Sequence, residues 1–151
     1  MSLLQLILDI IFSRRAAITP VEKGINLSGF IENTHFTWAE ALKNGDMYAT
    51  PTEEQKANII KQAHLLEGVR TILGPMQVTS WLRTVEHNKA VGGASKSTHL
   101  CGAATDFVPA LHSIEEAKRL ITESKCYPGG SEINSTTWIH LDFIHTKDFI
   151  A

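Results

Sequence analysis

The segment Ser97-Thr98-His99-Leu100-Cys101-Gly102-Ala103-Ala104-Thr105-Asp106 carries the most information about fold and chemistry. It holds an imidazole and a carboxylate, and both are common ligands of a borderline cation such as zinc. Gly102 and the two alanines after it are small, so the backbone between these ligands can turn tightly and bring them to one point. Residues 104–108 then have the character of a strand. The segment predicts a turn that leads into a strand, with His99 and Asp106 as candidate metal ligands.

A second strand is expected about thirty residues further on, over residues 136–143, because this stretch is rich in β-branched and aromatic residues. Within it, Trp138-Ile139-His140-Leu141-Asp142 alternates in polarity. With a period of two, His140 and Asp142 face one side of a sheet and the apolar residues between them face the other. A buried imidazole and carboxylate need partners, and a metal ion is one such partner. From spacing alone, a hydrogen-bonded histidine without a metal remains equally open.

The rest of the chain predicts helices and strands around these two segments. In chain order we expect a helix within residues 3–12, a short helix over 36–42, a helix that begins at a Thr50-Pro51-Thr52-Glu53 capping box, a strand over 76–81, a helix that begins with a capping box of Ser113 and Glu116, and a turn over 126–134. The predicted fold class is α+β: a single domain with an antiparallel β-sheet flanked by helices.

Composition excludes several classes of protein. The chain has 151 residues with a net charge of -2, so it lacks the overall basic field of a nucleic-acid-binding protein. Two cysteines are too few for a disulfide scaffold, and whether Cys101 and Cys126 pair stays open. The apolar run over residues 3–12 is shorter than the about 20 residues that span a bilayer, and its basic pair Arg14-Arg15 follows it. We therefore expect no membrane span and no clear signal peptide. A helix packed on the domain is favoured, with an export or membrane-surface role as the alternative.

Several residues of fixed type also stand at fixed offsets. They are Ser97-x-His99-x-x-Gly102-x-Ala104-x-Asp106, then Trp138-x-His140. This pattern resembles the signature of the D-alanyl-D-alanine carboxypeptidase-type zinc peptidases, a family that includes phage L-alanyl-D-glutamate endolysins and shares its fold with lysostaphin-type peptidases and the Hedgehog signalling domain. Ser80-Trp81-Leu82-Arg83 resembles the family's usual approach to the motif. The resemblance covers about residues 35–145. It implies an N-terminal helix and extension over residues 1–34 and a zinc peptidase-like domain over residues 35–151.

The resemblance implies roles for individual residues. His99, Asp106 and His140 would be the ligands of a zinc ion, with water at the fourth position. Zinc is preferred over other divalent ions on the type of ligand and on the resemblance. Arg83 would anchor a substrate carboxylate or stabilise a developing oxyanion. Ser97 would form a hydrogen bond within the site or support a ligand, and a turn-forming serine is the alternative reading.

The general base is the point at which the chain departs from the family. Many relatives have a glutamate three residues before the last histidine ligand, and this chain has Thr137 there. A threonine hydroxyl cannot accept a proton near neutral pH. Glu132 resembles the glutamate that precedes the Trp-x-His strand in some relatives, so we favour it as the base. Asp142, or no base at all, are the alternatives.

The function that the resemblance implies is zinc-dependent hydrolysis of peptide bonds in peptidoglycan stem peptides. The enzyme would be a D-Ala-D-Ala carboxypeptidase or an endolysin-like L-Ala-D-Glu endopeptidase. It would be made in the cytoplasm and act at the bacterial cell wall or in the periplasm, and a phage origin is compatible with this. The alternative is a non-catalytic zinc-binding module of the same fold that acts in structure or interaction. The sequence does not indicate an oligomeric state.

Overall fold

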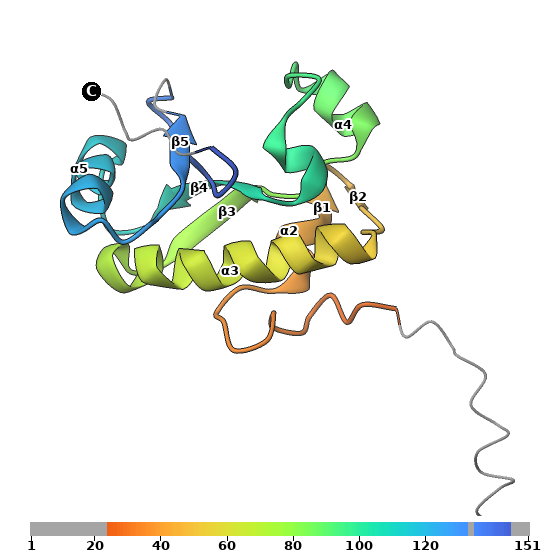
Figure 1. Ribbon diagram of the computed structural model, residues 1–151, viewed down its shortest axis with the longest axis horizontal. Helices are drawn as coiled ribbons and strands as arrows, with labels where there is room; N and C mark the ends of the chain where they lie inside the picture. Colours follow the sequence, from red (N-terminus) through yellow and green to blue (C-terminus); the bar gives the residue numbers. More distant parts are fainter. Residues whose placement is uncertain (1–23, 133–134, 146–151) are drawn as a thin grey trace, which may run out of the picture.

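A four-stranded antiparallel sheet forms the centre of the computed structural model, which describes residues 24–132 and 135–145 (Figure 1). The strands are β3 (Met76–Ser80), β4 (Ala104–Pro109), β5 (Gly130–Glu132) and β6 (Ile139–Asp142). Their order across the sheet is β3-β4-β6-β5, and each neighbouring pair is antiparallel. The predicted α+β class with an antiparallel sheet and flanking helices is confirmed.

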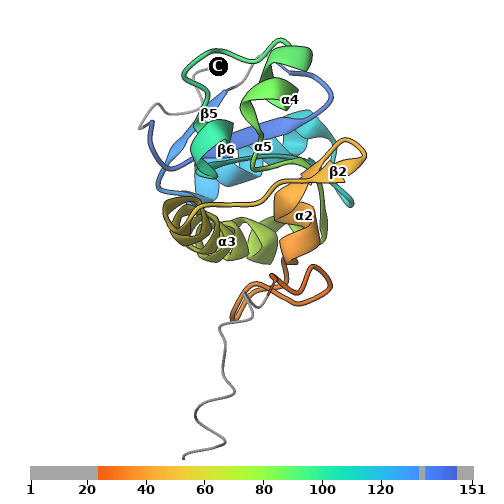
Figure 2. The same cartoon turned by 90° about the vertical axis from the view of Figure 1, so that its right-hand side faces the viewer.

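Helices lie on both sides of this sheet. They are α2 (Trp38–Leu42), α3 (Glu53–Leu73), α4 (Val85–Ala90) and α5 (Ile114–Ser124), with a 3-10 helix η1 (Thr98–Cys101) and a small hairpin of β1 (Lys43–Asn44) and β2 (Met47–Tyr48). In Figure 2, α3 lies below the sheet and α4 lies above it. Helix α5 packs beside α3 and against β4. None of the helices in the described ranges is long and apolar enough to cross a membrane.

The long helix α3 supplies one side of the hydrophobic core. Its N-cap is Thr52, whose hydroxyl accepts from the backbone N–H of Gln55 while the Gln55 side chain accepts from the Thr52 N–H. The capping box predicted at Thr50 is therefore two residues further on, and Pro51 precedes the helix. Apolar residues at helical spacing are buried along its inner face: Ile59, Ala63, Leu66, Val69 and Leu73. They pack on the α3-facing side of the sheet, because apolar surface is stabilised when it leaves water.

Two other predicted boundaries change in the structure. Strand β6 begins at Ile139 rather than at residue 136, because the Ser135 hydroxyl accepts from the backbone N–H groups of the two residues before Ile139 and forms a turn there. The turn predicted over residues 126–134 contains the short strand β5, which pairs with β6. At the start of α5, Ser113 accepts from the Glu116 N–H, but the Glu116 carboxylate binds Arg119 rather than completing a capping box.

The remaining fold predictions have mixed outcomes. Cys101 and Cys126 are both free, so the possible bridge between them is absent. The helix predicted within residues 3–12 lies outside the described residues. In the second part of the predicted extension, Ile31 is fully buried in the core and Phe30 bridges to Thr37. These described residues of the extension therefore pack on the domain, while the boundary at residue 34 stays a prediction.

Candidate metal centre

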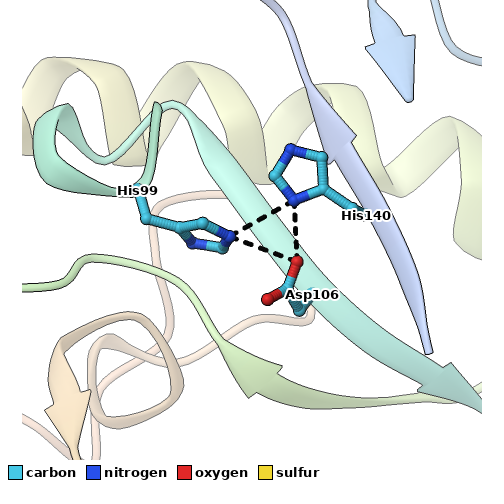
Figure 3. Close-up of side chains that lie close together, drawn as sticks. All are labelled: His99, Asp106 and His140. Atoms are coloured by element: carbon cyan, nitrogen blue, oxygen red, sulfur yellow. Dashed lines mark hydrogen bonds and ion pairs between the residues drawn. The ribbon is translucent and has the colours of Figure 1, made fainter. Parts of the chain in front are cut away.

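Three side chains from different parts of the chain converge on one point (Figure 3). His99 comes from η1, Asp106 from β4 and His140 from β6, and one ligand atom of each lies within 4.8 Å of the others. Asp106 Oδ1 is 3.1 Å from His99 Nε2 and 2.7 Å from His140 Nδ1. The two ring nitrogens are 3.2 Å apart. The structure thus brings together the three residues that the sequence proposed as metal ligands.

The sheet register explains how two of these residues meet. The register places four residues directly opposite one another in a row across the four strands: Ser80, Asp106, His140 and Glu132. Opposed residues in an antiparallel pair share one face of the sheet, and their Cβ atoms lie about 4.5–5.5 Å apart. Asp106 and His140 therefore lie on the face away from α3, since the residues that alternate with them, such as Leu141, are buried in the core. The alternation predicted for residues 138–142 is confirmed.

The loop geometry brings His99 to the same face. Ser97 caps η1, with its hydroxyl accepting from the His99 N–H at 3.4 Å. Gly102 ends η1 in the left-handed region, with φ at 79°. A Cβ at Gly102 would lie 3.1 Å from the backbone oxygen of Gln55 in α3, so glycine is needed there for close approach as well as for its conformation. The side chains of Gln55 and Asn58 donate to two carbonyls of η1. Ser97 is thus a turn-forming cap that also supports a candidate ligand.

Hydrogen bonds fix which nitrogen of each histidine faces the centre. His99 Nδ1 is 2.7 Å from the Trp81 carbonyl, which can only accept, so Nδ1 carries the hydrogen. His140 Nε2 is 3.3 Å from Asp142 Oδ2, and an ionised carboxylate can also only accept. The nitrogens that face Asp106 are His99 Nε2 and His140 Nδ1, and each offers a lone pair to a metal when its ring is neutral and its other nitrogen carries the hydrogen.

Two nitrogen lone pairs and a carboxylate oxygen therefore point at one another. Such a group of acceptors is stable only with positive charge between them, either as protons or as a metal ion. Histidine ligands of metals generally donate their other N–H to a carbonyl or a carboxylate, as His99 and His140 do here. Two imidazoles and one carboxylate also form a donor set that suits zinc. The residues present fit a divalent ion of this kind.

The electrostatics of the cluster agree with this. Burial would lower the pKa of His140, but its hydrogen bonds to Asp106 and Asp142 together outweigh burial and raise that pKa to about 9. Burial would raise the pKa of Asp106, but hydrogen bonds from His140 and His99 hold it well below its usual range. The cluster therefore keeps Asp106 ionised and favours a proton on His140, which a metal ion would displace.

Both carboxylate oxygens of Asp142 are engaged, by His140 and by the turn that follows β6. Its Oδ1 accepts from the backbone N–H groups of Ile144 and His145, and its Oδ2 contacts the rings of His140 and His145. Burial would raise the pKa of Asp142, but these hydrogen bonds from His140 and His145 lower it to about 2. Asp142 is thus a poor proton acceptor near neutral pH. No sequence signal pointed to a partner for His145, and only the turn after β6 shows its contact with Asp142.

Arg83 lies against Asp106. Its Nη2 donates to Asp106 Oδ2 at 2.7 Å and its Nε donates to Ser80 Oγ at 2.8 Å. The side chain is 14% exposed, and its other N–H groups have no partner in the part of the chain that the structure describes. Sequence reasoning expected Arg83 to face substrate and did not foresee its bond to a candidate metal ligand.

The candidate bases differ in their placement. Glu132 is in β5, in register with His140 and therefore at a position on the same face as the cluster. Thr137 is exposed and contacts the Ser135 hydroxyl.

Trp138 is 45% exposed although a tryptophan is usually packed inside, whereas Trp81 is fully buried.

The comparison with known families covers the three candidate metal ligands. A family model described as Peptidase M15 matches residues 34–142. A search among curated proteins finds no match. The matched span is most of the chain and contains the whole His-Asp-His cluster with the strands that position it. The chain therefore belongs to the peptidase M15 family, the zinc peptidases of the D-Ala-D-Ala carboxypeptidase type.

Proposed function

We propose that this protein is a zinc-dependent peptidase that cleaves peptide bonds in peptidoglycan stem peptides, with His99, Asp106 and His140 holding the metal. The observation that carries the proposal is the convergence of their three ligand atoms within 4.8 Å. Membership in the peptidase M15 family supports peptide hydrolysis. A bound zinc ion would supply a Lewis acid for the scissile carbonyl and an acidified water.

The chain's own residues would hold this site in shape. Asp142 and the Trp81 carbonyl keep the second nitrogens of His140 and His99 protonated, so the ligating nitrogens face inward without rearrangement. Ligating nitrogens that are already in position need no reorganisation during the reaction. The remaining N–H groups of Arg83 would donate to a substrate carboxylate or to the developing oxyanion, since a guanidinium can bind both oxygens of a planar acid.

Glu132 is the residue that we propose to accept the proton of the attacking water. Its register position opposite His140 supports this role. The contacts of Asp142 and its pKa of about 2 argue against Asp142 as the base, and the chemistry of a hydroxyl argues against Thr137. Once protonated, Glu132 could pass the proton to the leaving amine, as general bases in hydrolysis do.

The substrate and place of action follow from the resemblance. We propose that the enzyme acts at the bacterial cell wall or in the periplasm, either in an endolysin-like role that cleaves L-Ala-D-Glu bonds or as a carboxypeptidase that removes terminal D-Ala. The alternative is a non-catalytic zinc-binding module, and the observation that motivates it is Thr137 at the position where many relatives carry the base.

The test combines metal analysis with an assay on purified peptidoglycan. The wild-type protein should bind about one zinc ion per chain, as the three-ligand arrangement of a catalytic site requires. It should also release peptides that mass spectrometry can assign to one bond. His99→Ala should lose the metal. Glu132→Gln should keep the metal and lose activity, while the matched control Glu32→Gln, at an exposed position, should retain both. Zinc binding without release of any peptide would favour the non-catalytic module.

A further inference from the structure

An irregularity in strand β3 places an unexpected residue beside the candidate ligand Asp106. Val78 pairs with Phe107, but the register then shifts, so that Ser80 rather than Thr79 is opposite Asp106. One extra residue in a strand is a β-bulge, and bulges near functional sites often redirect a side chain. Because opposed residues share a face, the bulge puts Ser80 on the face that carries the metal centre. The Thr79 hydroxyl donates to the Asp106 backbone carbonyl at 3.1 Å and holds the bulge in place.

Ser80 connects to Asp106 through Arg83. The Arg83 Nε donates to Ser80 Oγ at 2.8 Å, and its Nη2 donates to Asp106 Oδ2 at 2.7 Å. The side chains of Arg83 and Asp106 are 14% and 10% exposed, so water screens their ion pair only weakly. The result is a chain of hydrogen bonds from the bulge to one oxygen of the carboxylate.

The two carboxylate oxygens of Asp106 therefore have different partners. Oδ1 faces His99 Nε2 and His140 Nδ1, whereas Oδ2 is held by Arg83. A carboxylate can bind a metal through one oxygen or through both, and a charge-assisted hydrogen bond to one oxygen favours binding through the other. Fixing Oδ2 keeps one coordination position from being filled by the protein.

We propose that Ser80 is a positioning residue that fixes the Arg83 guanidinium so that Asp106 binds the metal through Oδ1 alone. The inference rests on the proposed metal-dependent function. It gives Arg83 a role besides substrate binding, since the N–H groups that hold Ser80 and Asp106 are not those proposed to donate to substrate.

The same segment also positions a second ligand. The Trp81 carbonyl accepts from His99 Nδ1, and the Arg83 backbone N–H donates to the His99 carbonyl at 3.0 Å. Trp81 is fully buried, and its indole N–H donates to the Gly102 carbonyl at the end of η1. The segment from Ser80 to Arg83 therefore holds two of the three candidate ligands, which makes a change at Ser80 measurable at the metal.

The test measures zinc affinity and cobalt spectra rather than activity. In competition titrations with a chromophoric chelator, Ser80→Ala should bind zinc about tenfold more weakly, at the lower end of the range for groups that orient a ligand. Its cobalt(II) form should show a changed d–d absorption spectrum, because cobalt reports coordination number. Ser80→Thr keeps the hydroxyl and should restore both. Arg83→Lys, which cannot bridge Ser80 and Asp106 in the same way, should reproduce the Ser80→Ala spectrum or exceed its change.

Thr71→Ala removes an exposed hydroxyl that donates to the Glu67 carbonyl within α3, and it serves as the control, with unchanged affinity and spectrum. The proposal is overturned when Ser80→Ala binds zinc as tightly as the wild type with the same cobalt spectrum. Hydrolysis of peptidoglycan is scored separately. A wild-type protein that binds zinc but releases no peptide refutes the peptidase function, while the Ser80 inference is still decided by affinity and spectrum. A wild-type protein that binds no zinc overturns both.

Discussion

Replacing Asp142 by asparagine tests how the structure sets the protonation of His140. Asp142 Oδ1 accepts two backbone N–H groups, at 3.0 Å and 2.8 Å, and these contacts would retain the amide oxygen of an asparagine. The NH₂ group of the new side chain would then face His140 Nε2 at the place of Oδ2. Two donors cannot share one hydrogen bond, so Nε2 must give up its hydrogen and Nδ1 must carry it.

This change of tautomer would disable the ligand. A nitrogen that carries hydrogen has no lone pair for a metal, and Nδ1 is the nitrogen that faces Asp106 at 2.7 Å. Loss of an orienting group of this kind costs about 10–100-fold in metal affinity. Since a tenfold change corresponds to about 1.4 kcal/mol, the expected loss of binding free energy is about 1.4–2.8 kcal/mol.

The assay is a competition titration with zinc at neutral pH, together with nitrogen NMR of the His140 ring in the metal-free protein above its pKa of about 9, where the ring is neutral and the two tautomers can be distinguished. Asp46→Asn serves as the matched control, because it makes the same chemical change at an exposed position. Equal zinc affinity in Asp142→Asn and wild type would show that Asp142 does not set the His140 tautomer. An unchanged Nε2–H tautomer in the NMR spectrum of the variant would refute the argument directly.

Three further predictions concern His140, the turn at Gly102 and a buried hydrogen bond of the core. Because the fold raises the pKa of His140 from 6.5 to about 9, its protonation stabilises the apoprotein fully below pH 6.5, and this contribution disappears as pH rises through about 9. Zinc competes with that proton, so the affinity measured by titration should increase as pH rises toward about 9, and a flat profile would contradict the assignment. Gly102→Ala places a Cβ at a φ of 79° and should lower the free energy of unfolding in urea by at least about 1–2 kcal/mol. Gln62→Leu leaves the buried Tyr127 hydroxyl without its 2.6 Å acceptor and should cost about 1–3 kcal/mol in the same assay, whereas Gln62→Leu combined with Tyr127→Phe should recover part of this loss.

The buried pair of Gln62 and Tyr127 also links the core to the site. The Gln62 amide donates to the Leu141 carbonyl at 2.9 Å, in the strand that carries His140. Burial raises the pKa of Tyr127, with the charge of Asp142 adding to this, so its hydroxyl stays protonated and donates to Gln62. The contacts join α3 to β6 and to the segment before β5. They keep β6 in place behind the metal centre, on the side where no ligand atom is needed.

The sequence alone determined the parts of this protein that depend on neighbouring residues. Cap residues are local signals, and so is the alternation over residues 138–142, because each depends on a few positions along one element. The spacing of His99, Gly102 and Asp106 was equally readable, and the family resemblance was enough to join it to His140. The candidate ligands and the α+β class could therefore be predicted from patterns of residues along the chain.

Only the tertiary structure decided what surrounds the ligands. The bulge that puts Ser80 opposite Asp106, the short strand β5 that brings Glu132 into register with His140, and the turn that ties Asp142 to its neighbours all depend on which strands pair and with what offset. A shift of one residue would place each of these positions on the opposite face of the sheet. That offset is set by the packing of the whole core against α3, and no short stretch of the chain encodes it.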